Sequence, residues 1–128
     1  MKTLEDAAPE VAIVASDSAW MDVCALAELE PFWGEAALVA GHQVAVVRLP
    51  DDRLFAVGNL DPVADAQVMS RGIVGSRGDR PTIASPLHKE VYDLATGERL
   101  GAAGPGLGTY PVRIVDGRVE VLVPAGGG

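Results

Sequence analysis

Two short polar loops, each directly after an apolar run, contain the residues whose types could do chemistry. The first loop contains Asn59 and Asp61 and follows the apolar run 54–57, and the second contains Ser85 and His88 and follows the run 82–84. Polar side chains on loops at strand ends can be brought together by the scaffold that holds the loops. We therefore take these two loops as the place where a site could form.

These four side chains offer one carboxylate, one imidazole and two neutral oxygens, which is a weak donor set for a transition metal. Ser85 and His88 are also close enough in sequence to suggest a nucleophile and a base. No acid is evidently placed to orient the imidazole, so we predict no Ser–His–Asp arrangement. We expect no catalytic residue, cofactor or metal ion in this chain, and we expect His88 to hydrogen-bond locally or to face a partner.

The chain has one cysteine, Cys24. An intramolecular disulfide, and any site that needs two thiolates from this chain, are therefore excluded. Cys24 alternates with apolar neighbours, and we expect it to be a small buried strand residue. We expect His42, which follows Gly41 between two apolar runs, to be a solvated turn residue.

A polar segment between the two loops contains Arg71, Arg77 and Arg80. Arginine pairs readily with carboxylates across protein interfaces, and the alternative is a solvated loop whose arginines meet only water or Asp79. We favour the interface for Arg71 and the solvated loop for the other two. The glycines of 71–75 fit turn and bulge positions, since no phosphate-loop pattern and no following helix accompany them. The partner-binding candidates are Ser70, Arg71, Gly72, His88 and Lys89.

The elements that must position these loops are short strands joined by turns. The Asp116–Gly117 pair between two alternating runs predicts a hairpin. One short helix or turn is expected near 62–69, capped by Asp61 or Asp65. With no amphipathic helix period elsewhere, the pattern predicts an all-β sandwich or barrel. The expected strands cover 20–26, 35–40, 43–48, 54–57, 82–84, 110–115 and 118–123.

The composition suits one β domain. The chain has 128 residues, 15 glycines, 9 prolines and a formal charge of −8. This charge argues against nucleic acid and against an anionic membrane surface as partners. No apolar run reaches the roughly 20 residues of a membrane-spanning helix, and we expect a cytoplasmic protein. We expect a flexible leader over 1–18, a β domain over 19–123 and a disordered tail over 124–128.

The order of these features resembles the Rieske iron–sulfur domain, whose two loops carry a CxH pair and a CxxH pair. The second loop and its continuation survive here as the run from Ser85 to Thr96-Gly97, which includes Tyr92 and Asp93. Aligned on the loops, Asn59 and Asp61 replace the first pair and Ser85 replaces the second cysteine, so only His88 remains. A Rieske centre needs two thiolates and two imidazoles, which this chain cannot supply alone.

A more specific resemblance, over about residues 20–123, is to the small subunit of assimilatory NAD(P)H-dependent nitrite reductase, a Rieske-like family without the cluster ligands. The Ser70–Gly75 run is its most specific element. The resemblance implies a partner large subunit that carries siroheme, an iron–sulfur cluster and FAD and reduces nitrite to ammonia with NAD(P)H. It gives this chain a structural or regulatory role. The alternative is a Rieske-type ferredoxin-like electron carrier, or a binding module, for an oxygenase.

Overall fold

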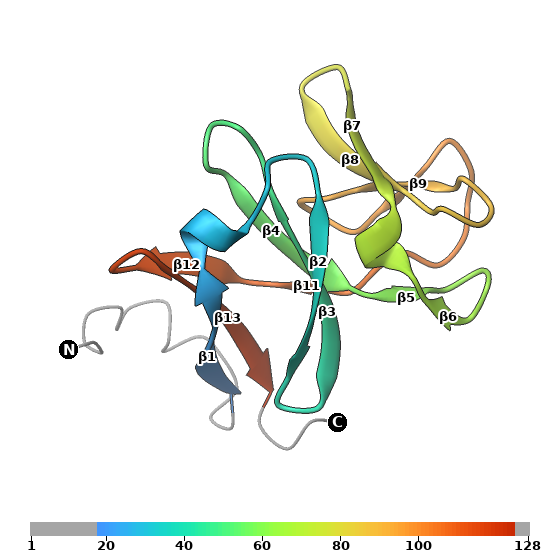
Figure 1. Ribbon diagram of the computed structural model, residues 1–128. Coiled ribbons are helices and arrows are strands. Elements are labelled where there is room, and N and C mark those ends of the chain that lie inside the picture. The colour runs from blue at the N-terminus through green and yellow to red at the C-terminus, as the bar shows by residue number, and fades with distance from the viewer. Residues whose placement is uncertain (1–17, 125–128) are drawn as a thin grey trace.

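Residues 18–124, the part of the chain that the computed structural model describes, form small antiparallel sheets and two short 3-10 turns (Figure 1). One sheet has the strand order β1-β13-β12 and a second has the order β11-β4-β3-β2. A third has the order β10-β9-β8-β7, and β5 pairs with β6 alone. The all-β fold class predicted from the sequence is confirmed. The strands are β1 (Ser18–Ala25), β2 (Gly34–Val39), β3 (His42–Arg48), β4 (Leu54–Gly58), β5 (Leu60–Asp61), β6 (Ala66–Gln67), β7 (Ile73–Arg77), β8 (Arg80–Ala84), β9 (Val91–Asp93), β10 (Arg99–Leu100), β11 (Thr109–Tyr110), β12 (Val112–Val115) and β13 (Arg118–Pro124), and the turns are η1 (Leu26–Glu28) and η2 (Met69–Arg71).

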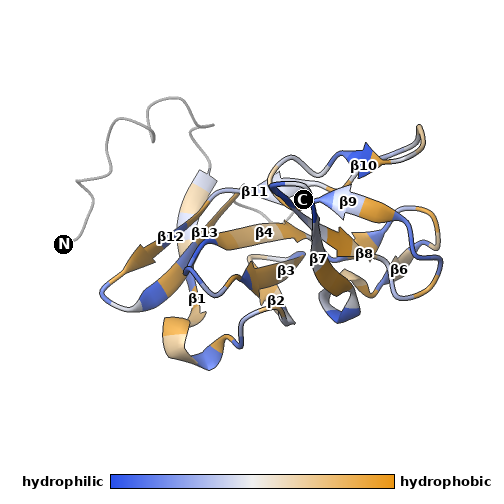
Figure 2. Ribbon diagram, turned by 90° about the horizontal axis from the view of Figure 1, so that it is seen from above, coloured by the Kyte–Doolittle hydropathy of each residue, from blue (hydrophilic) through white to orange (hydrophobic). Residues whose placement is uncertain are grey.

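The sheet that contains β3 and β4 is buried on both faces. Val44 and Val46 point into a core shared with valines of β13, and Ala45 and Val47 point into a second core shared with Ile83 and Tyr92. Successive strand residues face opposite sides, so a strand between two cores needs a continuous apolar run. Figure 2 shows β3 and β4 coloured mostly hydrophobic.

Tight turns set the register of two hairpins. Asp116 and Gly117, between β12 and β13, have φ of 51° and 76°, which is the conformation of a two-residue hairpin turn that matches strand twist. The predicted Asp-Gly hairpin is therefore confirmed.

Ala40 and Gly41 form the corresponding turn between β2 and β3, with φ of 50° and 86°. His42 is therefore the first residue of β3, and the prediction of a solvated turn residue is wrong. Its ring is half-buried, donates to the Pro124 carbonyl oxygen at 3.2 Å and meets the Tyr110 ring edge-on.

The segment expected to form a helix or turn near 62–69 forms a turn over 62–65, which is followed by β6, and Met69 begins the 3-10 turn η2. The side chain of Asp61 caps this turn, as one of the two expected caps. Within the described residues, no helix has the length and hydrophobicity to cross a membrane. The expected leader and tail lie outside these residues, except that Ser18 begins β1 and Pro124 ends β13.

Candidate functional site: the paired polar loops

The two polar loops meet through a side-chain hydrogen bond. Ser85, at the end of β8, donates its hydroxyl to the Oδ2 atom of Asp61 in β5. Both side chains are fully buried. We call residues 59–64 and 85–90 the paired loops. The structure therefore brings together two of the four predicted ligand positions, and they bind each other.

Asp61 is held as a carboxylate by donors on both of its oxygens. Its Oδ1 atom accepts the backbone amides of Val63 at 2.9 Å and Ala64 at 3.2 Å. Burial by itself raises the pKa of the Asp61 carboxyl, but the hydrogen bonds from Ser85 and these two amides, helped by the charge of His88, outweigh burial. The pKa of Asp61 is therefore held below its ordinary value, as expected for a carboxylate that accepts several hydrogen bonds.

Asn59 is buried and fixes the first loop to η2. Its Oδ1 atom accepts the amide of Ser70 at 2.7 Å, and its carbonyl oxygen accepts the amide of Met69 at 2.9 Å. Its own amide donates to the Gln43 carbonyl oxygen at 3.0 Å. The side-chain oxygen at this ligand position therefore already accepts a hydrogen bond from the Ser70 backbone.

The second loop closes on itself and exposes its tip. The Lys89 amide donates to the Ser85 carbonyl oxygen, and the Ser85 amide donates to that of Glu90, at 3.1 and 2.8 Å. Lys89 has a φ of 64°, and both it and His88 are exposed. The fourth ligand position therefore lies outside the buried group formed by Asn59, Asp61 and Ser85.

The donors of the paired loops do not fit the [2Fe-2S] cluster that the fold implies. Such a centre takes two thiolates on one iron and two imidazoles on the other. The loops offer an amide, a carboxylate and a hydroxyl that already make hydrogen bonds, together with the exposed His88. Cys24, the chain's one thiol, lies in β1.

Tyr92 lies buried near the paired loops with its hydroxyl unpaired. Burial raises the pKa of this hydroxyl, and the nearby charges of Asp61 and Glu90 raise it further. The sequence analysis named Tyr92 only as part of the run from Ser85 to Gly97. Nothing in the sequence indicates that its hydroxyl is unpaired. The neutral phenol is an unsatisfied polar group in the core.

The arginine-containing segment between the loops is anchored by close backbone packing. A Cβ atom on Gly72 would lie 2.5 Å from the Ala84 carbonyl oxygen, and one on Gly34 would lie 2.6 Å from the Ser70 carbonyl oxygen. Ser70 and Gly72 therefore serve packing, while Arg71 between them is exposed. The expectation that Arg80 meets only water or Asp79 is wrong, because it pairs with Asp93 at 2.7 Å and Glu98 at 3.0 Å.

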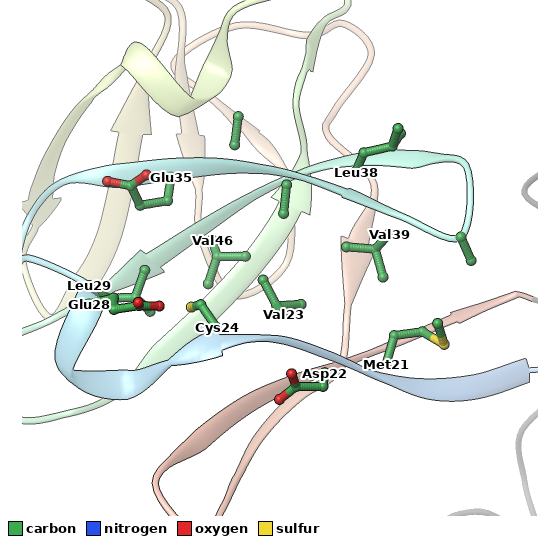
Figure 3. Close-up of a pocket in the computed structure, with 13 residues that line it drawn as sticks. Met21, Asp22, Val23, Cys24, Glu28, Leu29, Glu35, Leu38, Val39 and Val46 are labelled. Carbon is green, nitrogen blue, oxygen red and sulfur yellow. The ribbon is translucent and has the colours of Figure 1, made fainter.

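A groove of about 570 Å³ runs between β1 and β2 (Figure 3). Val23, Val39 and Val46 line it, and Cys24 is half-buried there. Burial and then the charge of Glu28 raise the pKa of the Cys24 thiol, which keeps it protonated and unreactive at neutral pH. The groove therefore offers apolar surface without an activated nucleophile.

Sequence reasoning passed over the loop Pro31-Phe32-Trp33, which directly precedes β2. Phe32 and Trp33 are 52% and 68% exposed. The available signal was their number, since this chain has only two Phe and two Trp and two of them stand side by side between strands. Adjacent exposed aromatic residues indicate a contact surface.

The fold and the paired loops define a Rieske-like domain, and residues 19–122 match the family model of the Rieske-like [2Fe-2S] domain. The chain belongs to this family. The nitrite reductase (NADH) small subunit of Salmonella typhimurium is 33% identical over 105 residues, which are 81% of this chain and 97% of that protein. A solved Mycobacterium tuberculosis protein, provisionally named an NADH-dependent nitrite reductase small subunit, has a TM-score of 0.80 and 41% identity, covering 84% of this chain and 97% of that one.

Two further relatives bear on the role of the domain. The nitrite reductase [NAD(P)H] large subunit of Klebsiella oxytoca is 31% identical over 102 residues, which are 80% of this chain but 11% of that protein. A domain like this one is therefore part of that large subunit. The anthranilate 1,2-dioxygenase ferredoxin subunit of Burkholderia cepacia is 38% identical over 90 residues, covering 69% of this chain and 78% of that protein.

Proposed function

We propose that this chain is the cluster-free small subunit of a cytoplasmic NAD(P)H-dependent nitrite reductase that serves nitrate assimilation. The large subunit would carry the siroheme, iron–sulfur cluster and FAD, would bind NAD(P)H and would reduce nitrite to ammonia. This chain would dock on it as a structural or regulatory subunit of the oxidoreductase and would supply no catalytic residue. Two relatives support the pairing, one a small subunit and one a large subunit with a domain of this kind.

The observation that carries the cluster-free role is the Asp61–Ser85 hydrogen bond. In the Rieske family the two loops are joined through the cluster they bind. Here a buried carboxylate and a buried hydroxyl at two of the ligand positions join the loops directly. A hydrogen bond to a buried, charged acceptor stabilises more than a neutral one does, so the loops can keep their positions without a metal.

The second candidate function, an electron carrier for an oxygenase, is favoured by the likeness to a dioxygenase ferredoxin. That function requires a redox group in this chain. Because the donors of the paired loops do not fit the cluster, we rank the carrier below the nitrite reductase subunit.

The experiment that separates the two functions is purification of the full chain with a test for bound cluster and for partner. We expect a colourless protein without iron or acid-labile sulfide that co-purifies with a siroheme flavoprotein from the same cell. Visible absorption together with iron and sulfide would support the carrier instead. A siroheme enzyme that keeps full activity without this chain and never associates with it would remove the proposal.

A further inference from the structure

Four exposed side chains lie on three segments that come near one another in the fold, the loop before β2, η2 and β7. Phe32, Trp33 and Ile73 are 52%, 68% and 66% exposed, and Arg71 is exposed as well. The backbone of Gly34, next to Trp33, touches the backbone of Ser70, next to Arg71. We call Phe32, Trp33, Arg71 and Ile73 the aromatic patch. Its composition of Trp, Phe, Arg and Ile contains residue types that are enriched at protein interfaces or supply their apolar contact.

The loop presents its aromatic side chains from a fixed backbone. Phe32 has a φ of 70°, a conformation that is rare for a bulky residue and that persists only where surrounding contacts impose it. Its amide donates to the Arg48 carbonyl oxygen at 2.8 Å, and the Trp33 amide donates to that of Glu30 at 3.1 Å. The Arg48 guanidinium in turn holds the Leu29 carbonyl oxygen at 3.0 Å. A rigid loop loses little conformational freedom on binding.

A hollow of about 550 Å³ adjoins the patch. Phe32 lines it together with Pro50 of the β3–β4 turn and with Gly75 and Pro81 of the β7–β8 hairpin. Figure 1 shows these three segments at the same end of the molecule, at the top of the view. Charged residues, Asp51, Arg53 and Asp79, also line the hollow, so it is a recess of mixed polarity beside the exposed Phe32.

Arg71 is the charged member of the patch and makes no ion pair with any residue of 18–124, whereas many of the other arginines there do. Arg48, Arg53, Arg80, Arg113 and Arg118 each pair with a carboxylate. An unpaired arginine beside exposed aromatic residues, on a chain with a formal charge of −8, can form a bidentate pair with a carboxylate that another protein supplies.

We propose that the aromatic patch is the surface that docks on the nitrite reductase large subunit, with Arg71 pairing with a carboxylate of that subunit. This inference rests on the function proposed above. The occupant follows from the Klebsiella relative, in which a domain of this kind and a large subunit share one polypeptide, and from the charge of Arg71. The tip of the paired loops is the competing surface, and it offers Leu87, His88 and Lys89 instead; lysine is depleted at interfaces.

The test measures binding of the full chain and its variants to the purified large subunit. The two patch variants are Trp33→Ala and Arg71→Glu. The two control variants lie elsewhere on the surface: Leu38→Ala removes an apolar side chain that is 73% exposed on β2, and Lys89→Glu makes the same charge change as Arg71→Glu on the paired loops. We expect each patch variant to bind more weakly, with a dissociation constant raised on the order of 30-fold, as for a residue at the centre of an interface. The two controls should stay within about threefold of the unaltered chain, since peripheral residues contribute little.

Thermal unfolding of each variant shows that the fold is retained, because all four side chains are exposed. Hydroxyl-radical footprinting gives a readout without substitution: Phe32 and Trp33 should be oxidised in the free chain and protected in the complex, with Leu38 oxidised in both. Patch variants that bind like the unaltered chain, or loss of binding only with Lys89→Glu, would overturn the aromatic patch and leave the proposed function intact. Failure of the unaltered chain to bind the large subunit at all would overturn both.

Discussion

At the scale of single residues, the paired loops show how a metal-binding scaffold can be held by hydrogen bonds. Asp61 and Ser85 occupy two ligand positions and form one buried pair, and Asn59 holds the Ser70 amide. A buried carboxylate is tolerated only when several donors surround it. The three donors to Asp61 meet that requirement.

Removing the Ser85 hydroxyl should destabilise the fold. Ser85→Ala leaves the Oδ2 atom of Asp61 buried without its donor, which typically costs about 1–3 kcal/mol in the free energy of unfolding. Urea denaturation of Ser85→Ala and of Ser76→Ala, an exposed serine of β7, measures the difference. Equal stability of the two variants would show that the Asp61–Ser85 bond does not hold the loops.

Stability should fall in acid because of Asp61 and Asp93. Burial raises the pKa of Asp93, but hydrogen bonds from Arg80 and two backbone amides lower it more, so both carboxyls have lowered pKa values in the folded chain. The unfolded chain, with Asp pKa values of about 3.9, therefore binds protons first as the pH falls. Their contribution is fully present above that pH and is lost below it. Urea denaturation at pH 7 and pH 3 should show this loss.

Asp61→Asn supplies the control for the acid effect, since it removes one of these two buried carboxyls. Its free energy of unfolding should be lower at pH 7 and should fall less between pH 7 and pH 3. A variant with the same pH dependence as the unaltered chain would contradict the lowered pKa of Asp61.

Tyr92→Phe should not destabilise the chain, although Tyr92 is fully buried. Its hydroxyl has no hydrogen-bond partner, and removing an unpaired buried polar group is neutral or stabilises by up to about 1 kcal/mol. Thermal unfolding of the variant checks this. A clear fall in the midpoint would mean that the hydroxyl has a bonding partner.

At the scale of elements, close backbone contacts place η2 and β7. Gly72 lies against the Ala84 carbonyl oxygen of β8, and Gly34 lies against Ser70. These contacts explain why positions 34 and 72 are glycines: the backbone must approach its neighbours there, while the Arg71 side chain next to Gly72 is exposed. The run Ser70–Gly75 was recognised from the sequence, but its division into packing residues and one surface residue depends on these distances.

Gly72→Ala should therefore destabilise the fold, because its Cβ would lie 2.5 Å from backbone. Overpacking of this kind typically costs about 1–3 kcal/mol. Gly75→Ala, three residues further along in β7, is the matched control, since its Cβ meets only the Thr82 hydroxyl at 3.7 Å. Denaturant unfolding of both compares them, and a Gly72→Ala variant as stable as the control would refute the close contact.

Local chemistry made some elements predictable and left others uncertain. The Asp116–Gly117 hairpin has its own turn signal, so it was predicted. Of the helix or turn expected near 62–69, the structure has the turn at 62–65, because the Asp61 side chain accepts the amides of Val63 and Ala64 and β5 then pairs with β6. The turn between β2 and β3 was predicted one position too late, at Gly41 and His42. The chain turns at Ala40 and Gly41 instead, with Ala40 at positive φ, where a non-glycine residue is uncommon.

At the scale of the whole molecule, the fold keeps the two-loop arrangement of its family. Two exposed surfaces, the tip of the paired loops and the aromatic patch, are available to a partner. The positions of the paired loops could be predicted from the sequence, because strand ends and residue spacing mark them. The aromatic patch could not, since it combines the loop before β2 with η2 and β7. These two elements follow that loop by more than thirty residues in the sequence and come near it only in the folded chain, for example where Gly34 meets Ser70.

The central claim is that this chain acts as a subunit without a cluster of its own. Native mass spectrometry of the complex purified from cells tests both parts at once. We predict a complex with the large subunit from which this chain is released at the mass of its polypeptide alone. Release with the added mass of two irons and two sulfides, or a chain found only in its free form, would contradict the account.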